Sequence, residues 1–300
     1  MTRLEPMAEK RRARSLAEVQ ERMASVFSEE VLKKGLEVSL RPTDVVVTPF
    51  GKSGTTWTQQ IVHTLRTRGD MDFDDISRVV PWIEVSAALD IDLDAEQKAN
   101  PRAFKSHLAW GPMPKGGKYI NVVRDPVDAA ISMHRFQEGW FLEPGAVSLD
   151  EFIVKGYLKD RRYYHHLKSW WPRRNDDDVL FLAYEHMLED GTGTIRRIAS
   201  FIDIELDDEL LAITEEHSSR EFMLRHKDRF DDAMMRTMSE EKAGIPAGSD
   251  SAKVTAGAKV ELSKETRQVL NQVWHEEITT SLGFETYNDL IEALHQDVSD

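Results

Sequence analysis

Short apolar runs alternate with longer amphipathic stretches through much of this 300-residue chain. Several runs are mostly apolar without strict alternation, which is typical of strands buried on both faces of a parallel sheet: Val45–Thr48, Ala103–His107, Tyr119–Val123 and Val179–Tyr184. Helical patterns separate or follow them at Thr55–Arg68, Val127–Arg135, Arg161–Trp170 and Thr194–Phe201. Strands that alternate with helices predict a single α/β domain with a central, doubly wound parallel sheet flanked by helices. Ligands of such sheets bind at the carboxyl ends of the strands.

Outside the predicted sheet, the pattern indicates a helical extension and a loop. Residues 8–34 are rich in Ala, Glu, Arg and Leu and contain neither Pro nor Gly, which predicts helix. We therefore divide the chain into an N-terminal helical extension (1–40) and a main domain (41–300). Residues 228–252 mix charged residues with Met, Gly and Pro. This composition predicts a mobile loop, such as a lid, or a disordered connection.

The composition argues against several classes of protein: disulfide-rich, secreted, membrane-spanning and nucleic-acid-binding. The chain is 40% hydrophobic, has no cysteine and carries a formal net charge of −14. Without cysteine there is no disulfide framework and no thiolate metal site, which fits a reducing, cytoplasmic location. The N-terminus lacks the apolar core of a signal peptide, and no run of about eighteen apolar residues would span a membrane. The negative charge opposes nucleic-acid binding, so an anionic ligand needs a local cluster of cations and backbone donors.

The segment Val45 to Trp57 reads strand, glycine-containing loop, helix start, which is an order that builds an anion site. Gly51 and Gly54 permit positive φ and close approach of the backbone to a ligand. The backbone N–H groups of Ser53 to Thr56 have no helical partners, and the helix dipole favours negative charge there. Lys52 adds a full positive charge, so the expected ligand carries phosphate or sulfate. A Walker A loop would need Gly at position 46, where this chain has valine.

The run Lys-Ser-Gly-Thr-Thr-Trp at 52–57 closely resembles the signature of sulfotransferases that use 3′-phosphoadenosine 5′-phosphosulfate (PAPS). The alternative is a generic strand–turn–helix junction. The resemblance implies a P-loop-NTPase-like sulfotransferase architecture that releases 3′-phosphoadenosine 5′-phosphate (PAP) and needs no metal. It also implies that Trp57 stacks on the adenine, and that the 5′-phosphosulfate is held by Lys52, Ser53, Gly54, Thr55 and Thr56.

A second strand–turn–helix motif runs from Tyr119 to Ser132. A strand that ends in Asp125 superficially resembles a Walker B strand, whose aspartate holds Mg²⁺. The next residue is Pro126, however, and Asp-Pro is typical of an N-cap followed by the first helical residue. In the PAPS-dependent family an Arg and a Ser at this spacing bind the 3′-phosphate, and here they match Arg124 and Ser132. Taken singly, each is also compatible with an ion-pair partner or a helix-surface hydroxyl.

A third element, Lys105-Ser106-His107-Leu108, resembles the Lys-Thr-His-Leu motif of the family, whose histidine is the general base. Histidine suits removal of a hydroxyl proton because its pKa lies near working pH. Lys52 suits neutralisation of the leaving phosphate, by analogy with phosphoryl transfer. Lys105 is either a second such cation or an ordinary strand-end lysine. His165 and His166 lie on a predicted helix among aromatic residues and are expected to be packing or surface residues.

Two further segments resemble parts of the family that contact the nucleotide. Leu180–Met187 resembles the family's strand that ends in Tyr-Glu-x-Met, which makes Tyr184 a candidate adenine contact, with a core aromatic as the alternative. His217–Met223 resembles a helix whose first hydroxyl touches the nucleotide, and Ser218 takes that place. Arg220 stands where many members have Phe, and an arginine can also stack on an adenine.

The largest departure lies at 253–259. Many relatives have Arg-Lys-Gly here, and the basic pair clamps the 3′-phosphate. This chain keeps Gly257 but has Thr255-Ala256 in place of the pair. Either Lys253 or Lys259 substitutes, or the 3′-phosphate rests on the earlier arginine and serine with weaker affinity, since one charged hydrogen bond is worth about 1.5–3 kcal/mol.

The sequence thus predicts a PAPS-dependent sulfotransferase that acts on a hydroxyl of a phenol, an alcohol or a glycolipid. An apolar acceptor pocket would be lined by aromatic residues that are equally compatible with a core: Trp82, Trp110, Trp140 and Phe141. Family members often form homodimers, so the resemblance implies one here. A P-loop kinase that uses ATP and Mg²⁺, and a nucleotide-binding module without activity, stay open as alternatives.

Overall fold

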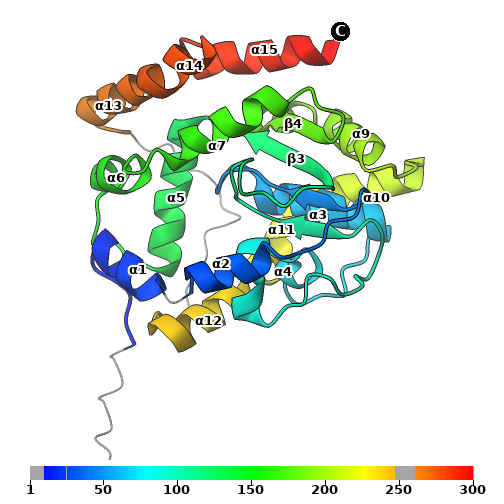
Figure 1. Ribbon diagram of the computed structural model, residues 1–300, viewed down its shortest axis with the longest axis horizontal. Helices are drawn as coiled ribbons and strands as arrows, with labels where there is room; N and C mark the ends of the chain where they lie inside the picture. Colours follow the sequence, from blue (N-terminus) through cyan, green and yellow to red (C-terminus); the bar gives the residue numbers. More distant parts are fainter. Residues whose placement is uncertain (1–9, 25, 247–260, 300) are drawn as a thin grey trace, which may run out of the picture.

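The computed structural model describes residues 10–24, 26–246 and 261–299, and its centre is a parallel sheet (Figure 1). In the described residues the sheet has four strands in the order β2-β1-β3-β4. Val45 pairs with Ala103 on one side and Lys118 on the other, and Tyr119 pairs with Val179. The predicted strands are confirmed as β1 (Val45–Val47), β2 (Ala103–Lys105), β3 (Lys118–Val123) and β4 (Val179–Ala183).

Helices cover both faces of the sheet, as predicted for a doubly wound fold (Figure 1). Val45 and Val47 point to one face, where they pack in a core with residues of α3 (Thr55–Thr67), α9 (Gly191–Phe201) and α10 (Asp208–Ser218). Val46 points to the other face, whose core includes residues of α5 (Pro126–Trp140), α7 (Arg162–Trp170), α13 (Lys264–Trp274) and α15 (Tyr287–Ser299). Alternation of side chains along β1 thus places apolar valines in both cores.

Shorter helices complete the described chain. The α-helices are α1 (Leu16–Met23), α2 (Glu29–Gly35), α4 (Ile76–Val79), α6 (Leu149–Phe152), α8 (Tyr184–Glu189), α11 (Arg220–Arg225), α12 (Ala233–Ala243) and α14 (Thr280–Leu282). The 3₁₀-helices are η1 (Ile83–Leu89), η3 (Trp171–Arg173) and η4 (Lys227–Phe230), and the π-helical turns are η2 (Ile153–Tyr157) and η5 (His275–Thr279).

The prediction of one continuous helix over residues 8–34 is wrong. The structure has two short helices there, α1 and α2, each begun by a serine whose hydroxyl accepts a backbone N–H. Ser28 caps α2 and is followed by Glu29 and Glu30, an acidic first turn that is typical of a helix start. Ahead of α1, Ala13 exchanges backbone hydrogen bonds with the segment 141–143, so part of the extension is tied to the main domain.

The prediction of a loop at 228–252 is also wrong for the part that the structure describes. Residues up to Phe230 continue a 3₁₀-helix, and α12 follows. Phe230, Met235 and Met238 are buried, so these apolar side chains of the segment pack into the core. Residues 247–252 lie outside the described residues.

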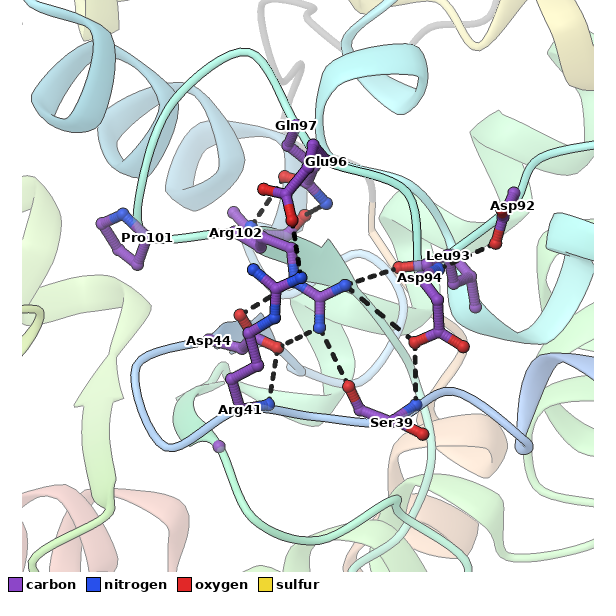
Figure 2. Close-up of polar contacts among 12 residues, drawn as sticks. Ser39, Arg41, Asp44, Asp92, Leu93, Asp94, Glu96, Gln97, Pro101 and Arg102 are labelled. Carbon is purple, nitrogen blue, oxygen red and sulfur yellow. Dashed lines mark hydrogen bonds and ion pairs between the residues drawn. The ribbon is translucent and has the colours of Figure 1, made fainter.

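A buried ion pair joins the amino ends of β1 and β2. The Arg102 guanidinium is 2% exposed and donates from Nε to Asp44 Oδ1 (3.1 Å) and from Nη2 to Asp44 Oδ2 (2.5 Å). Arg102 also donates from Nη1 to Leu93 O (3.0 Å) and from Nη2 to Ser39 O (2.9 Å) (Figure 2). This side chain therefore holds together the segments that enter the sheet, at the edge away from the strand ends where the motifs lie.

Candidate active site

The carboxyl ends of the strands bring the separate sequence motifs together. Lys52 to Thr56 follow β1, His107 follows β2, Arg124 follows β3 and Tyr184 follows β4. Because β1 lies between β2 and β3, its loop sits where ligands bind in such sheets. Arg124 Nη1 donates to Lys52 O (2.9 Å), and His107 Nδ1 lies 2.7 Å from Pro49 O. The loop after β1 thus contacts both neighbouring motifs.

The loop after β1 has the backbone expected of a phosphate site. Lys52 has φ 69° and Gly54 has φ 91°, which is the left-handed region that favours glycine. A Cβ on Gly54 would lie 2.9 Å from Cδ2 of Tyr184, so glycine is also needed for space. Gly54 is the N-cap of α3 and has no side chain to accept a hydrogen bond, so first-turn N–H groups of this helix stay available to a ligand. The expectation that the Ser53 N–H is also available is wrong, because it donates to Phe50 O at 3.1 Å within the loop.

Buried hydroxyls in this loop fit an anionic ligand. Ser53 Oγ and Thr55 Oγ1 are buried and have no hydrogen-bond partner in the part of the chain that the structure describes. Arg124 Nε, beside the same loop, is likewise buried and has no partner among the described residues. Since buried polar groups in folded proteins are normally hydrogen-bonded, these donors indicate a bound group rich in acceptor oxygens, as a phosphate or sulfate is.

Arg124 is held in place by its neighbours. Its guanidinium carbon lies 4.3 Å from the centroid of the Tyr184 ring. Tyr163 donates from its hydroxyl to Arg124 O at 2.6 Å, which fixes the turn after β3. The next residue, Asp125, accepts the N–H groups of Val127 and Asp128, so the prediction that it is a helix cap is confirmed.

The residues assigned to the nucleotide lie in different settings. Ser132 is partly buried on α5, in the helix that Asp125 caps. Trp57 and Tyr184 meet edge to face with ring centroids 5.8 Å apart. Ser218 is buried, and its hydroxyl donates to Thr214 O (2.6 Å) within α10. Gly257, like the rest of 253–259, lies outside the described residues.

His107 has the protonation state that a general base needs. A carbonyl oxygen only accepts, so the 2.7 Å contact with Pro49 O places the ring proton on Nδ1. Nε2 is then the basic nitrogen. Burial, followed by the charge of Lys105, lowers the pKa of His107 to about 3, so the expectation of a pKa near working pH is wrong. The imidazole is neutral at neutral pH but is a weaker base than an ordinary histidine. The residue as a whole is only partly buried, so a small molecule can approach it.

Lys105 is engaged in an ion pair that sequence reasoning missed. It is 4% exposed, and its Nζ lies 3.3 Å from Asp232 Oδ2 and 4.2 Å from the Trp82 ring centroid. Asp232 also accepts a hydrogen bond from Ser77 Oγ at 2.6 Å. No local signal marks Asp232, which lies in the segment predicted to be a loop.

The aromatic candidates for an acceptor pocket separate into two groups. Trp82 lies against His107, with ring centroids 5.3 Å apart. Trp140 and Phe141 are buried in the apolar core that contains Met235 of α12, and Trp82 packs against the same core, so these three form one group. Trp110 forms the second group, because it packs in a different core cluster, against Tyr119 and Trp170.

One aromatic residue near the catalytic candidates was missed. Phe136 of α5 lies 4.7 Å from Lys52 Nζ, measured to the ring centroid. It also contacts Trp140 with ring centroids 4.7 Å apart. Its place four residues beyond Ser132, and so on the same face of the helix, is a signal that could have found it.

His165 and His166, on α7, lie in different environments. His166 is buried, its Nε2 lies 3.1 Å from Thr48 O, and its ring packs near Phe50. Burial lowers its pKa to about 4. The expectation of packing and surface roles is confirmed, since His165 is exposed.

Comparison with known proteins identifies the family. Residues 42–282 match the family described as the sulfotransferase domain. The chain belongs to the sulfotransferase family. The resemblance seen in the sequence motifs is thereby confirmed, and the protein is a sulfotransferase.

Individual relatives of this sulfotransferase are distant. Sulfotransferase 1B1 of the dog (Canis lupus familiaris) is 31% identical over 198 residues, which are 61% of this chain and 67% of that protein. Amine sulfotransferase of the rabbit (Oryctolagus cuniculus) is 31% identical over 192 residues, 60% of this chain and 62% of that protein. The matching region thus spans about two thirds of the length of these relatives.

Solved structures confirm the architecture. Retinol dehydratase in complex with androsterone and PAP superimposes with a TM-score of 0.65 at 20% identity, covering 93% of this chain and 98% of that chain. Mouse sulfotransferase SULT7A1 complexed with PAP gives 0.63 at 21% identity, with 91% and 95% covered. At these identities the likeness shows the fold, and the predicted sulfotransferase architecture is correct.

Two further observations concern metal ligands and membrane-spanning helices. In the described part of the chain, no group of three or more His, Cys, Asp and Glu side chains is placed to hold a metal ion. None of the described helices is long and apolar enough to cross a membrane.

Proposed function

We propose that this sulfotransferase moves the sulfuryl group of PAPS to a hydroxyl of a small-molecule or lipid acceptor. The observation that carries the proposal is the hydrogen bond between His107 Nδ1 and Pro49 O. It joins a histidine whose Nε2 is free of a proton to the loop with the geometry of a phosphate site. A base and an anion cradle in one place suit transfer of an anionic group to an alcohol.

The residues act in a single displacement. His107 Nε2 takes the proton of the acceptor hydroxyl as that oxygen forms a bond to sulfur. The bond from sulfur to the 5′-phosphate oxygen breaks, and its electrons stay on the departing PAP. Lys52, the Ser53 hydroxyl and the N–H groups of Gly54 to Thr56 stabilise this charge, since cations and helix N-termini favour anions. Arg124 and Ser132 hold the 3′-phosphate.

Lys105 takes a positioning role in this proposal. Its pairing with Asp232 in a buried setting supports a cation that shapes the field around His107. Trp82 and Phe136 form apolar walls beside the base and Lys52. Aromatic walls suit phenols, apolar alcohols and glycolipids, because flat or aliphatic groups bury apolar surface there.

A thermal-shift titration tests the nucleotide. PAP should raise the melting temperature in the absence of metal, because the donors on Arg124, Ser53 and Thr55 gain partners. ATP with Mg²⁺ should have a smaller effect at the same concentration, since it lacks a 3′-phosphate. A larger shift with ATP and Mg²⁺ would favour the P-loop kinase. Tight PAP binding without sulfate transfer to any member of a broad phenol and alcohol panel would favour an inactive nucleotide-binding module.

The pH dependence of turnover follows from the lowered pKa of His107. At pH 5.5 a histidine with the ordinary pKa of 6.5 is mostly protonated, and a base of that kind loses about tenfold in activity. His107 stays neutral there because its pKa is about 3. We expect kcat/KM for PAPS, which reports the free enzyme, to fall less than about twofold between pH 7.5 and 5.5. An acid limb with its midpoint at 6.5 or above would contradict this assignment.

A further inference from the structure

An acidic side chain replaces a backbone acceptor at the end of β2. The segment before η1 runs beside β2, and Lys105 N donates to Pro81 O at 2.7 Å. After Trp82, which still forms a bridge with Lys105, the chain turns away into η1. The next N–H on this edge of the strand belongs to His107, two residues on, and it donates to Glu84 Oε1 at 2.6 Å.

The Glu84 carboxyl group is enclosed. Its Oε2 is buried, and among the described residues it has no well-aligned hydrogen-bond donor. Burial raises the pKa of this carboxyl group, although the Trp82 and Ser106 side chains lie near enough to lower the pKa in part. Oε1 can accept the His107 N–H whether or not the group is ionised, because the second oxygen carries the proton in the neutral acid. A short contact of this kind at the end of a strand fixes the backbone of the residue that donates to it.

We propose that Glu84 is a positioning residue for sulfuryl transfer, which holds His107 through its backbone N–H so that Nε2 faces the acceptor. The inference rests on the proposed function, in which His107 is the base. Glu84 holds the backbone, and Pro49 O holds Nδ1 of the ring at 2.7 Å. Trp82, two residues before Glu84, lies against the ring. Together these contacts leave the imidazole one orientation.

The energetic reason is that proton transfer depends steeply on geometry. A displacement of about 1 Å in a reacting group can cost about 100-fold in rate. Without Glu84, the His107 N–H loses its acceptor and the strand end is released. The phosphate loop, which accepts a hydrogen bond from His107 Nδ1 at Pro49 O, keeps its own hydrogen bond from Arg124 to Lys52 O. Catalysis should therefore suffer while nucleotide binding persists.

Kinetics of three variants test this role. Glu84→Ala should lower kcat by about 10- to 100-fold, with KM for PAPS and the thermal shift produced by PAP close to wild type. Glu84→Gln keeps an oxygen at the Oε1 position and should retain kcat within about threefold. Ser86→Ala is the matched control, because Ser86 is buried in the same 3₁₀-helix and donates to Ile83 O at 3.0 Å without touching His107. It should leave kcat unchanged.

A spectroscopic measurement separates this inference from the proposed function. In wild type, the His107 backbone amide proton should resonate downfield and exchange slowly, and in Glu84→Ala it should move upfield and exchange faster, whether or not the protein transfers sulfate. Glu84→Gln should resemble wild type. If wild type transfers sulfate to no acceptor, the proposed function fails and the amide measurement alone decides whether Glu84 holds His107.

Several outcomes would overturn the positioning role. One is an unchanged His107 amide resonance in Glu84→Ala. Others are a kcat of Glu84→Ala within about twofold of wild type, or an equal loss in Ser86→Ala. A Glu84→Gln variant as impaired as Glu84→Ala would show that the charge matters and not the acceptor oxygen. Loss of the PAP-induced thermal shift in Glu84→Ala would show a general collapse of the site.

Discussion

Replacing His107 with alanine is expected to lower kcat for sulfuryl transfer by about 1,000-fold, within the range of 10²–10⁴ that a positioned general base contributes. The acceptor hydroxyl then has to lose its proton to water as it attacks sulfur. PAP binding should persist, because the phosphate-loop N–H groups and Arg124 do not depend on the imidazole. Single-turnover transfer of radiolabelled sulfate, together with a PAP thermal shift, measures both quantities.

His165→Ala is the matched control for this substitution. His165 is an exposed histidine on α7 and should tolerate alanine without a change in kcat. His107→Ala with turnover near wild type would remove the base from the proposed mechanism. A loss of PAP binding in His107→Ala, with the fold intact, would instead make the histidine a part of the nucleotide site.

The parts of this site that the sequence predicts are local or follow from one topological rule. The phosphate loop is a continuous run, and its backbone conformation depends on Gly54 and on the start of α3 a residue later. His107, Arg124 and Tyr184 are far apart in sequence, yet each follows a strand of one parallel sheet. Because carboxyl ends of parallel strands lie on one edge, the convergence could be expected.

The parts that sequence reasoning missed depend on single long-range contacts. Lys105 and Asp232 are 127 positions apart, and Glu84 and His107 are 23 apart. The chain has 53 Asp and Glu residues, and no local pattern shows which of them meets a buried lysine or a strand-end N–H. Helix α12 was missed for a related reason. The Gly and Pro of this segment lie beyond the end of the helix, and Met235 and Met238 become buried only when the helix packs against the domain.

Asp44→Asn is expected to lower the free energy of unfolding by about 3–5 kcal/mol, the cost of breaking a buried ion pair from one side. Asp44 is 0% exposed and accepts from Arg102 Nε and Nη2 and from the Arg41 N–H. Asparagine keeps the shape but loses the charge, so the Arg102 guanidinium stays buried without its directly bonded counter-charge, and the exposed Asp94 carboxylate at 4.0 Å compensates little. Urea unfolding followed by circular dichroism measures the change, with an m-value that should stay constant.

Asp94→Asn is the control within the same cluster (Figure 2). Its carboxylate is 55% exposed and lies 4.0 Å from Arg102 Nη1, so screening by water should limit the loss to about 1 kcal/mol or less. If Asp44→Asn cost no more than Asp94→Asn, the pair would not hold the amino ends of β1 and β2. The location of the pair makes a second consequence testable. The folded fraction of Asp44→Asn should transfer sulfate at the wild-type rate, because catalysis depends on the opposite edge of the sheet, where His107 and the phosphate loop keep their contacts.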